Sequence, residues 1–433
     1  MTRLTDYTSY ADAQRHFSSA ALWSLFDGNR RSLNIAVECL DRHADSGRVA
    51  VRVAHADGRD ETLGFRDLSE WSSRFAHWLA AHPARYEANS GPDDLAVFQY
   101  TSGTTRELPA AVRHPQRAIV ALMVAALYGT GIRPGDRFFC PSSPAWGHGL
   151  WHGTLAPLAL GVTTGTMAGK FDPVRMLRAL QEYEVTNVAA AATHYRMLKS
   201  SGQAGAYRYG IRKLSFTGEP MDSAARAFVE TTFGTRVCSM YGTTEVGVIL
   251  ADYPGAEDYT PRPGALGKPV PGVRVEVHDA EGRPCPPNQI GEIKVWRREA
   301  WFPTKDRAHV DGDGYFYHAG RSDDVIISAG WTMSAVEIED VLLRHPDVRE
   351  AAVIGVADSL RGQVVKAFIV STRNGDDAFV RELQDLARTR LSQHEYPRQV
   401  AFVAALPKTP AGKVNRKALR EAEAGAVEPT HAP

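Results

Sequence analysis

The 433-residue chain has few cysteines, and they form no pattern. Cys39, Cys140, Cys238 and Cys285 stand far apart, with no CxxC pair and no nearby Cys–His spacing. This scatter argues against a disulfide framework and against a structural zinc site. We therefore expect a chain that works in a reducing, cytoplasmic environment.

Long apolar runs and excess charge of one sign are also missing. The longest apolar run, residues 118–128, is shorter than the roughly 20 residues that a membrane span needs. Residues 1–14 lack the apolar core of a signal peptide. Fifty basic residues balance fifty acidic ones, so no bulk charge favours nucleic acid or an anionic membrane. We expect neither as a partner.

What the chain does contain is the composition of a globular protein, with 43% hydrophobic and 23% charged residues. Its length predicts two or three domains. Strand-like apolar runs alternate with helical patterns after residue 95, which predicts an α/β fold with a mainly parallel sheet. The expected helices cover residues 64–82, 176–183 and 224–233, and the expected strands cover residues 95–100, 138–143, 187–192 and 214–218.

The pattern changes twice in the C-terminal half. Short strands punctuated by Gly and Pro over residues 262–298 predict a small β-rich subdomain. A compact α+β unit follows, and we place its boundary within residues 320–324. This predicts an N-terminal domain of residues 1–321 and a C-terminal domain of residues 322–433. Within the latter we expect helices at 335–345 and 379–391 and strands at 350–356 and 364–371.

Four short motifs carry the chemistry. The stretch TSGTT, residues 101–105, clusters hydroxyls and a glycine directly after a strand, an arrangement that suits a polyphosphate. The P-loop signature is absent, and for this stretch alone a polar surface turn would be the favoured interpretation. Three more stretches follow in order: SMYGTTEVG (239–247), DGYFYHAGRSDDVIISAGWTMSAVEIED (313–340) and LPKTPAGKVNRKALR (406–420). Together they resemble the adenylate-forming (ANL) superfamily of acyl-CoA synthetases, peptide-synthetase adenylation domains and luciferases.

The resemblance covers most of residues 95–420 and is strongest to the acyl- and aryl-acid:CoA ligases. It implies that a carboxylate attacks the α-phosphate of ATP to give an acyl-adenylate and pyrophosphate, and that the thiol of CoA then displaces AMP. Since an anion must approach a polyanion, catalysis is chiefly charge neutralisation and alignment. The implied cofactors are ATP, Mg²⁺ and CoA.

The same resemblance assigns roles to residues of the large domain. Thr101, Ser102, Gly103, Thr104 and Thr105 would cover the β- and γ-phosphates. Gly218, Glu219 and Pro220 would flank adenine, Tyr241 would stack on it, and Gly242 and Thr243 belong to the same nucleotide motif. Thr244 would contact the α-phosphate and Glu245 would bind Mg²⁺, a metal that prefers oxygen ligands. Asp306 and Arg321 would hold the ribose hydroxyls.

Further roles fall in the small domain, which the resemblance implies is mobile. Asp323 would be the hinge between two orientations of this domain. Lys413 would enter beside the reacting carboxylate and the α-phosphate for the first step. After rotation, Gly330 and Trp331 would line the pantetheine tunnel. Trp331 could instead be a core residue, and Lys408, Arg416 and Lys417 are expected to belong to a solvated basic face.

Two motifs depart from the family pattern. The phosphate loop lacks its usual lysine, and Arg106 or Arg113 either replaces that charge or faces solvent. The usual Thr-Gly-Asp of the ribose motif is Thr304-Lys305-Asp306 here.

The acid pocket is expected in PAWGHGLWHG (144–153) and AAATHYRML (190–198). From these we take Trp146, Gly147, His148 and His194 as pocket residues, with Trp151 and His152 beside them. Several of the histidines could instead be packed or capping side chains. Tryptophan walls favour an aromatic or short- to medium-chain acid.

Relative to the family, the chain is short before the phosphate loop. Only residues 83–94 separate the helix near His82 from the next strand, where the resemblance implies a much longer segment. The uncovered surface predicts a homodimer or another partner that covers this face. The leading hypothesis is a carboxylic acid:CoA ligase. The alternatives are an adenylating enzyme that passes the acyl group to a carrier protein or another nucleophile, and a non-catalytic nucleotide-binding remnant.

Overall fold

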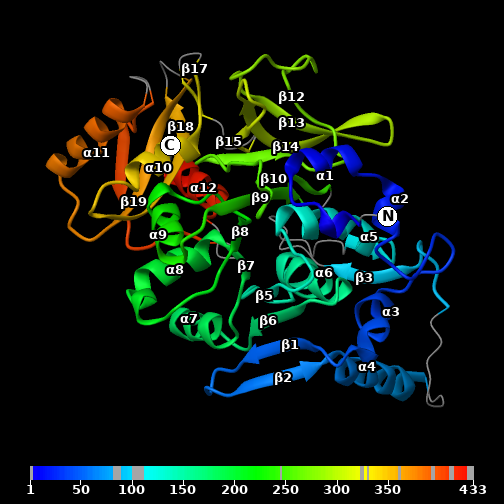
Figure 1. Ribbon diagram of the computed structural model, residues 1–433. Helices are drawn as coiled ribbons and strands as arrows, with labels where there is room; N and C mark the ends of the chain where they lie inside the picture. The colour runs from blue at the N-terminus through cyan, green and yellow to red at the C-terminus, as the bar shows by residue number, and fades with distance from the viewer. Residues whose placement is uncertain are drawn as a thin grey trace, which may run out of the picture. The chain divides into compact units, whose positions relative to one another are not determined.

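The computed structural model describes residues 3–80, 89–99, 112–243, 246–321, 326–328, 331–358, 362–391, 395–408 and 414–426 (Figure 1). The chain forms two compact units, which we treat separately. The first contains Met1–Glu219, Ala225–Arg262 and Leu266–Arg274, and the second contains Pro220–Ala224, Pro263–Ala265 and Val275–Pro433. The domain boundary between residues 321 and 322 stays a prediction.

The first unit is built on a twisted sheet in which the strands from β9 to β1 are parallel and the outer ones antiparallel. The mainly parallel α/β sheet that the sequence predicts is therefore confirmed. In spatial order the strands are β11 (Ala265–Pro269), β10 (Gly247–Ala251), β9 (Val237–Thr243), β8 (Lys213–Thr217), β7 (Asn187–Ala191), β5 (Arg137–Phe139), β6 (Thr163–Met167), β1 (Val49–Ala54) and β2 (Asp60–Gly64).

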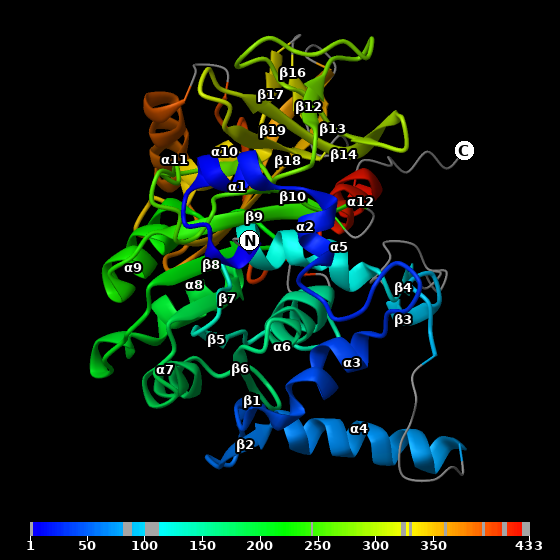
Figure 2. The same cartoon turned by 45° about the vertical axis from the view of Figure 1, so that its right-hand side comes forward.

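Helices cover both faces of this sheet, which explains why its central strand β7 is buried along its whole length. α7 (Pro173–Glu182) and α8 (Ala192–Ser201) lie on one face, and α5 (Ala118–Val124) and α6 (Ala156–Ala159) on the other (Figure 2). α7 begins where the Asp172 carboxylate accepts from the Arg175 N–H at 2.7 Å, with Pro173 at the first helical position. α9 (Ser223–Phe233) connects β8 to β9.

The strand connections reverse direction between β5 and β7. From β5 the chain passes through the π-helical segment η4 (His148–Leu155) and α6 to β6, on one side of β5. It then returns through α7 to β7, on the other side of β5, and continues outward to β8 and β9. In open α/β sheets, ligands bind beyond the carboxyl ends of the strands at such a reversal.

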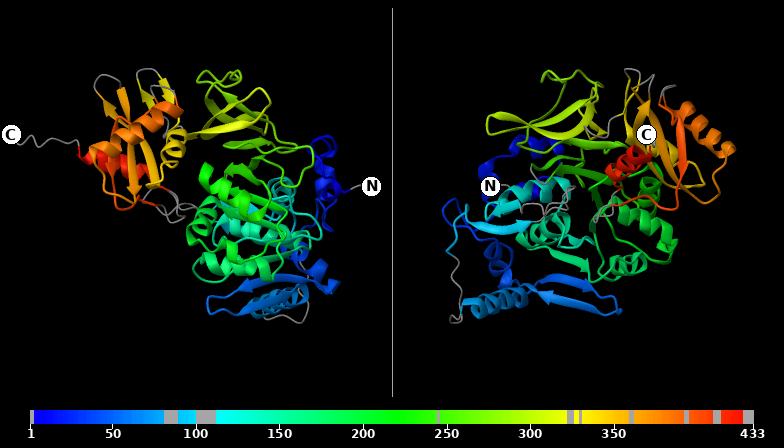
Figure 3. Two further views of the ribbon diagram at one scale, coloured as in Figure 1. Left: turned by 60° about the vertical axis from the view of Figure 1, so that its left-hand side comes forward. Right: turned by 180° about the vertical axis from the view of Figure 1, so that it is seen from behind.

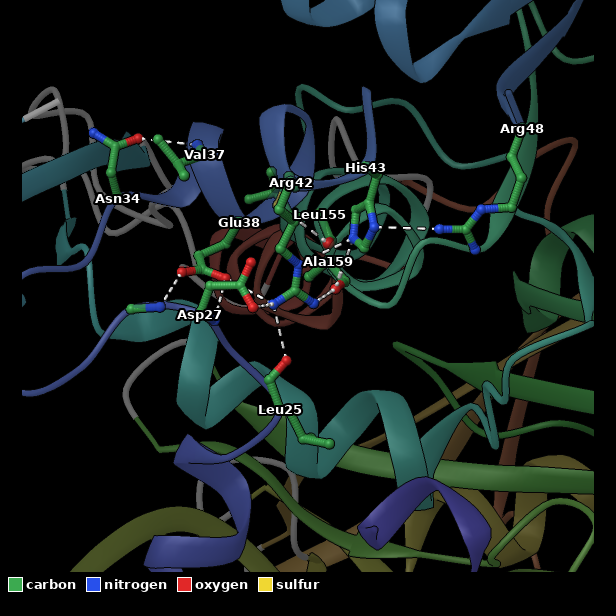
Figure 4. A network of polar contacts seen from close by, with 12 residues as sticks. Leu25, Asp27, Asn34, Val37, Glu38, Arg42, His43, Arg48, Leu155 and Ala159 are labelled. Carbon is green, nitrogen blue, oxygen red and sulfur yellow. Dashed lines mark hydrogen bonds and ion pairs between the residues drawn. The ribbon is translucent and has the colours of Figure 1, made fainter. Parts of the chain in front are cut away.

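The N-terminal segment is fixed by a buried ion pair. Its elements are η1 (Leu4–Asp6), α1 (Tyr10–His16), α2 (Ser19–Trp23), α3 (Ile35–Cys39), η2 (Asp41–Ser46) and α4 (Phe65–Ala80). The Glu38 side chain accepts from the Gly28 N–H at 2.7 Å and from Arg42 Nη1 at 2.8 Å, and Arg42 also donates to the carbonyls of Leu25 and Ala159 (Figure 4). These bonds tie the segment to α6.

Two smaller elements complete this unit. β3 (Leu95–Gln99) and β4 (Val112–Pro115) form a separate antiparallel pair.

The apolar run at residues 118–128 is largely buried. It forms α5 and the π-helical turn η3 (Ala125–Gly129). The short helix η5 (Ala204–Ala206) follows α8. Among the described residues, no helix is both long and apolar enough to cross a membrane. All four cysteines are free thiols.

The described residues of the second unit form an antiparallel four-strand region, an antiparallel two-strand pair, a mixed three-stranded sheet and three helices (Figure 3). β12 (Val275–His278), β13 (Gly291–Arg297), β14 (Ala300–Val310) and β15 (Phe316–Arg321) form the predicted β-rich region, and β16 (Ile326–Ser328) pairs with β17 (Trp331–Met333). β18 (Val348–Asp358), β19 (Gly362–Ser371) and β20 (Gln399–Phe402) form a three-stranded sheet with α10 (Ala335–Leu342), α11 (Asp377–Arg390) and α12 (Arg416–Ala426).

Successive residues of β18 enter different cores, as the two-residue period of a strand requires. Val353 packs in the cluster that contains Ile338 of α10 and Phe379 of α11. Ile354 packs in a second cluster with Leu419 of α12. This C-terminal α+β arrangement agrees with the sequence prediction.

Candidate functional site

Several predicted site residues lie outside the described residues, and their roles stay predictions. These are Thr101, Ser102, Gly103, Thr104 and Thr105 of the phosphate loop, Thr244, Glu245, Asp323, Gly330 and Lys413, together with Arg106. Arg113 is described. It lies opposite Phe98 in the β3–β4 pair, with its guanidinium 5.7 Å from the centre of that ring.

The turn after β8 holds the residues expected beside adenine. Gly218 has φ of 93°, a conformation that favours glycine. One carboxylate oxygen of Glu219 accepts from the Thr193 N–H at 2.8 Å, accepts from the Thr193 hydroxyl, and pairs with Arg196 Nη2 at 2.7 Å. The carboxylate therefore lies at the N-terminus of α8, where negative charge is stabilised. This contact connects the turn after β8 to the segment that follows β7.

Tyr241, Gly242 and Thr243 end β9 and pair with the antiparallel strand β10. A Cβ atom on Gly242 would lie 2.0 Å from the Gly247 carbonyl oxygen, so only glycine fits there. The close pairing fixes the backbone on which the half-buried Tyr241 stands. Its stacking on adenine stays a prediction.

The segment after β5 forms a buried aromatic and histidine cluster at the reversal of the sheet. Nδ1 of the buried His148 lies 2.9 Å from the Ser142 hydroxyl, a hydrogen bond. The His148 ring lies 5.4 Å from that of Trp146 and 5.7 Å from that of His152. Burial, reinforced by His152 and His194, lowers the pKa of His148 well below its usual value. Burial lowers the pKa of His152 to about 4. Both rings are therefore neutral near pH 7.

Two ring nitrogens of this cluster are buried with no hydrogen-bond partner in the part of the chain that the structure describes. They are Nε2 of His148 and Nδ1 of His152. Buried polar atoms normally have a partner, so these two can accept or donate one hydrogen bond to a ligand or a water molecule.

Gln99, at the end of β3, contacts the same segment. Its side-chain oxygen accepts from the indole N–H of Trp151 at 2.8 Å. A Cβ atom on Gly147 would lie 2.5 Å from the Gln99 side-chain nitrogen, so the glycine permits this close approach. His114 of β4 stacks edge-on against Trp151, with ring centres 4.8 Å apart. The β3–β4 pair thereby supports the predicted pocket segment.

His194 acts as a cap in this structure. Its Nδ1 accepts from the Ala191 N–H at 3.2 Å at the start of α8, and its ring lies 4.5 Å from that of Phe171. Burial lowers the pKa of His194 to about 4, and the Glu219 charge opposes this shift only in part. The histidine is neutral and has a structural partner. Its place in the acid pocket stays a prediction.

In the second unit, Asp306 and Arg321 are directly opposite each other in the β14–β15 pair. Asp306 is buried, its N–H donates to the Thr304 hydroxyl at 3.2 Å, and its carboxylate lies 3.7 Å from His318 Nε2. Lys305, which stands between Thr304 and Asp306, has φ of 65°, in the left-handed region that favours glycine. The departure from Thr-Gly-Asp therefore keeps the glycine-like backbone and places a lysine on it.

Sequence reasoning missed three contacts of these segments. They are the pairing of Glu219 with Arg196, the bond between Ser142 and His148, and the bond between Gln99 and Trp151. For the first contact a usable signal existed: Thr193 and Arg196 are three residues apart, so on a helix they lie on one face and can share one partner. The other two join residues whose proximity depends on the strand order.

Trp331 is described only as the first residue of β17.

Comparison with known proteins identifies the family. Residues 80–299 match the AMP-binding enzyme family, and residues 337–413 match the AMP-binding enzyme C-terminal domain. The chain is 32% identical to an uncharacterized acyl-CoA ligase, YtcI, of Bacillus subtilis (78% of this chain, 67% of the relative) and 30% identical to the acetyl-coenzyme A synthetase of the same bacterium (76% and 61%). The chain belongs to the AMP-binding enzyme family. It spans about 60 to 67% of the length of the curated relatives it matches.

Solved structures show the same fold. An acyl-CoA synthetase of Brucella canis is 26% identical, with a TM-score of 0.70 over 98% of this chain and 100% of that one. A benzoate CoA ligase of Burkholderia xenovorans is 26% identical, with a TM-score of 0.68 over 89% and 82%. The amide bond synthetase McbA of Marinactinospora thermotolerans is 28% identical, with a TM-score of 0.68 over 79% and 72%.

Proposed function

We propose that this chain is an ATP-dependent carboxylic acid:CoA ligase that forms an acyl-adenylate and releases AMP and pyrophosphate. Membership of the AMP-binding enzyme family and the CoA-ligase names of the relatives support the reaction class. The single observation that supports it most strongly is structural. Segments 144–153 and 190–198 follow the carboxyl ends of β5 and β7, the two strands at which the sheet connections reverse.

In this proposal, the residues of the chain bind and align two anions. The hydroxyls of residues 101–105 and the ammonium group of Lys413 neutralise the triphosphate while the acid approaches. Asp306 and Arg321 hold the ribose, and Tyr241 stacks on adenine. Glu245 would hold Mg²⁺, which supplies charge neutralisation at the phosphates. The C-terminal domain of residues 322–433 would rotate about Asp323 between the two steps.

The proposed substrate is an aromatic or short- to medium-chain acid. Trp146, Trp151 and His148 fill space in the segment after β5, which leaves little room for a long chain. The structural likeness to a benzoate CoA ligase supports the aromatic option, and the identity with an acetyl-coenzyme A synthetase supports the short-chain option.

A second candidate shares the first step but passes the acyl group to an amine or a carrier-protein thiol. The likeness to an amide bond synthetase favours it. Both candidates predict pyrophosphate exchange that depends on ATP and the acid. Only the ligase predicts thioester formation with free CoA.

The deciding experiment is a panel of aryl and aliphatic acids, scored for AMP release with and without CoA and for acyl-CoA by mass spectrometry. The proposal predicts that CoA accelerates AMP release for at least one acid and that the matching thioester forms. AMP release without any thioester would favour the second candidate. No AMP release with any acid, despite ATP binding by calorimetry, would favour a nucleotide-binding remnant.

We also propose that the chain is a homodimer. α4 exposes the large apolar side chains of Trp71 (50%) and Phe75 (63%), and β3 exposes Phe98 (53%). Such surface is a common site of association. Light scattering of the wild type and of Trp71→Ser across a range of concentrations tests this. A monomer at all concentrations would contradict it.

A further inference from the structure

The first unit contains a cavity of about 180 Å³ that the proposed reaction does not use. It lies where β1, β5 and β6 begin. Arg137 and Thr163, the first residues of β5 and β6, are direct neighbours in the sheet, and Arg52 of β1 is the neighbour of Gly165 of β6. The side chains of Arg48, Arg52 and Arg137 line this cavity, which we call the arginine cavity.

Backbone carbonyls and an aromatic ring hold these guanidinium groups. Arg48 donates to the Gly161 carbonyl, and Arg137 donates to the Glu184 carbonyl. Arg52 lies over the Tyr183 ring, 5.4 Å from its centre, and its Nε is buried with no hydrogen-bond partner among the described residues. A buried donor without an acceptor is costly, and it is satisfied when an acceptor enters the cavity.

The neighbouring carboxylates do not neutralise this charge. Asp60 accepts from the Tyr183 hydroxyl and pairs with Arg178 at 3.3 Å. The Glu184 carboxylate is 3.8 Å from Arg137 Nη2, at the long end of an ion pair. None of the residues that line the cavity is acidic. The floor is apolar and includes Phe138 and Val185.

The side chain of Arg48 is held by hydrogen bonds to the Gly161 carbonyl and to His43. Its Nη2 lies 3.2 Å from His43 Nδ1, and His43 follows Arg42 in the buried network of Glu38 (Figure 4). Burial lowers the pKa of His43 to about 4, with further contributions from Arg42 and Arg48. His43 is therefore neutral near pH 7 and adds no positive charge of its own. The guanidinium of Arg48 is thus oriented before any ligand binds.

The arginine cavity lies at the opposite edge of the sheet from the predicted acid pocket. Residues 144–153 and 190–198 follow the carboxyl ends of β5 and β7, whereas the cavity is at the amino ends of β1, β5 and β6. A ligand in the cavity would therefore be neither the reacting acid nor the nucleotide.

We propose that the arginine cavity binds a small oxyanion, a carboxylate or a phosphate, as a second site on this protein. Guanidinium groups match both anions by paired N–H···O bonds, and convergence of several cations favours an anion over a neutral ligand. Arg52 supplies the unsatisfied donor, and Arg48 and Arg137 supply charge at the rim. The apolar floor gives a short carboxylate a place for its hydrocarbon part.

Isothermal titration with sodium acetate and, separately, with sodium phosphate tests this proposal. Ionic strength is held constant with sodium chloride, and a saturating non-hydrolysable ATP analogue blocks phosphate binding at the nucleotide site. The variants are Arg52→Met, which keeps the aliphatic part of the side chain, and Arg52→Lys, which keeps the positive charge and loses the paired N–H donors of the guanidinium. Arg390→Met, at an exposed end of α11, removes the same charge elsewhere.

We expect an anion site in the wild type and in Arg390→Met that is weakened about tenfold or more in Arg52→Met and less in Arg52→Lys, whereas any acetate bound in the proposed acid pocket is unaffected by these variants. If Arg52→Met loses the acetate signal, the cavity is a carboxylate site. If Arg52→Met loses the phosphate signal, the cavity is a phosphate site. Absence of binding in the wild type, or equal binding in wild type and Arg52→Met, overturns the proposal. If Arg52→Met unfolds, Arg137→Met serves in its place. Thermal unfolding without anion checks that each variant is folded. Failure of the acid:CoA ligase assay would leave this result unaffected, because the titration needs no turnover.

Discussion

Glu219 and Thr193 join the ends of two neighbouring strands, with the Glu219 carboxylate oxygen 2.8 Å from the Thr193 N–H. The bond caps α8 and brings the turn after β8 against the segment after β7. The predicted adenine and acid segments are thereby held together by one side chain of the first unit.

Glu219→Ala removes this cap and one partner of Arg196, and we expect it to lower the free energy of unfolding by about 1 to 2 kcal/mol. Glu219→Gln keeps an acceptor for Thr193 and loses only the partly exposed pairing with Arg196, so its cost should be under about 1 kcal/mol. Urea unfolding followed by circular dichroism measures both. Equal stability of Glu219→Ala and the wild type would contradict the capping role.

Lys305 is a non-glycine residue at φ of 65°. Lys305→Gly should raise stability by up to about 1 kcal/mol, because glycine adopts this conformation without the Cβ clash, less the entropy it adds to the unfolded chain. Lys305→Ala is the matched control, since it removes the long side chain and keeps the clash. Equal unfolding midpoints for the two variants would show that backbone strain is not the cause.

Asp252 gives a pH dependence of stability. It is fully buried, it accepts from the Ser239 N–H at 2.9 Å, and burial raises its pKa to about 6. Between about pH 4 and pH 6 the folded state binds more protons than the unfolded state, so this group makes stability fall as pH rises. Asp252→Asn should remove that component, worth at most about 3 kcal/mol.

Melting temperatures of Asp252→Asn and the wild type at pH 4 to 7 test this. The variant should gain relative to the wild type as pH rises. The buried histidines act in the opposite direction in both proteins and cancel in the comparison. A constant difference across this range would contradict the shifted pKa.

Lys413→Ala should reduce acyl-adenylate formation by about a hundredfold to a thousandfold, because one charge contact to the reacting phosphate is lost. Lys408→Ala is the control. Its ammonium group is half exposed and pairs with Glu350 at 2.9 Å. Pyrophosphate exchange measures this step directly. If Lys413→Ala and Lys408→Ala lost equal activity, the special role of Lys413 would be wrong.

Much of the fold was predictable because periodicity reports local structure. The helix predicted at residues 64–82 begins at Phe65 and is described to Ala80, and the helix predicted at 379–391 is α11, Asp377–Arg390. The strands predicted at 187–192 and 214–218 are β7 and β8. Apolar runs of this kind predict strands whatever their neighbours are.

The candidate site was predictable only in part. Resemblance supplied the residue types for nucleotide binding, and the left-handed Lys305 agrees with the glycine that the motif usually has there. It did not supply partners. His194 is a predicted pocket residue, and the sequence did not show that its Nδ1 accepts from a backbone N–H, a bond that depends on where α8 starts.

The sequence by itself determined the family, the α/β class, the order of the motifs and the residue types that would neutralise ATP, because these depend on local pattern and on the linear spacing of motifs. Only the tertiary structure decided which segments meet. The reversal between β5 and β7 puts residues 144–153 beside residues 190–198, and the parallel pairing of β1, β5 and β6 brings Arg52 and Arg137 to one cavity. Both follow from strand order, which is set by long-range burial of apolar faces and not by any local sequence signal.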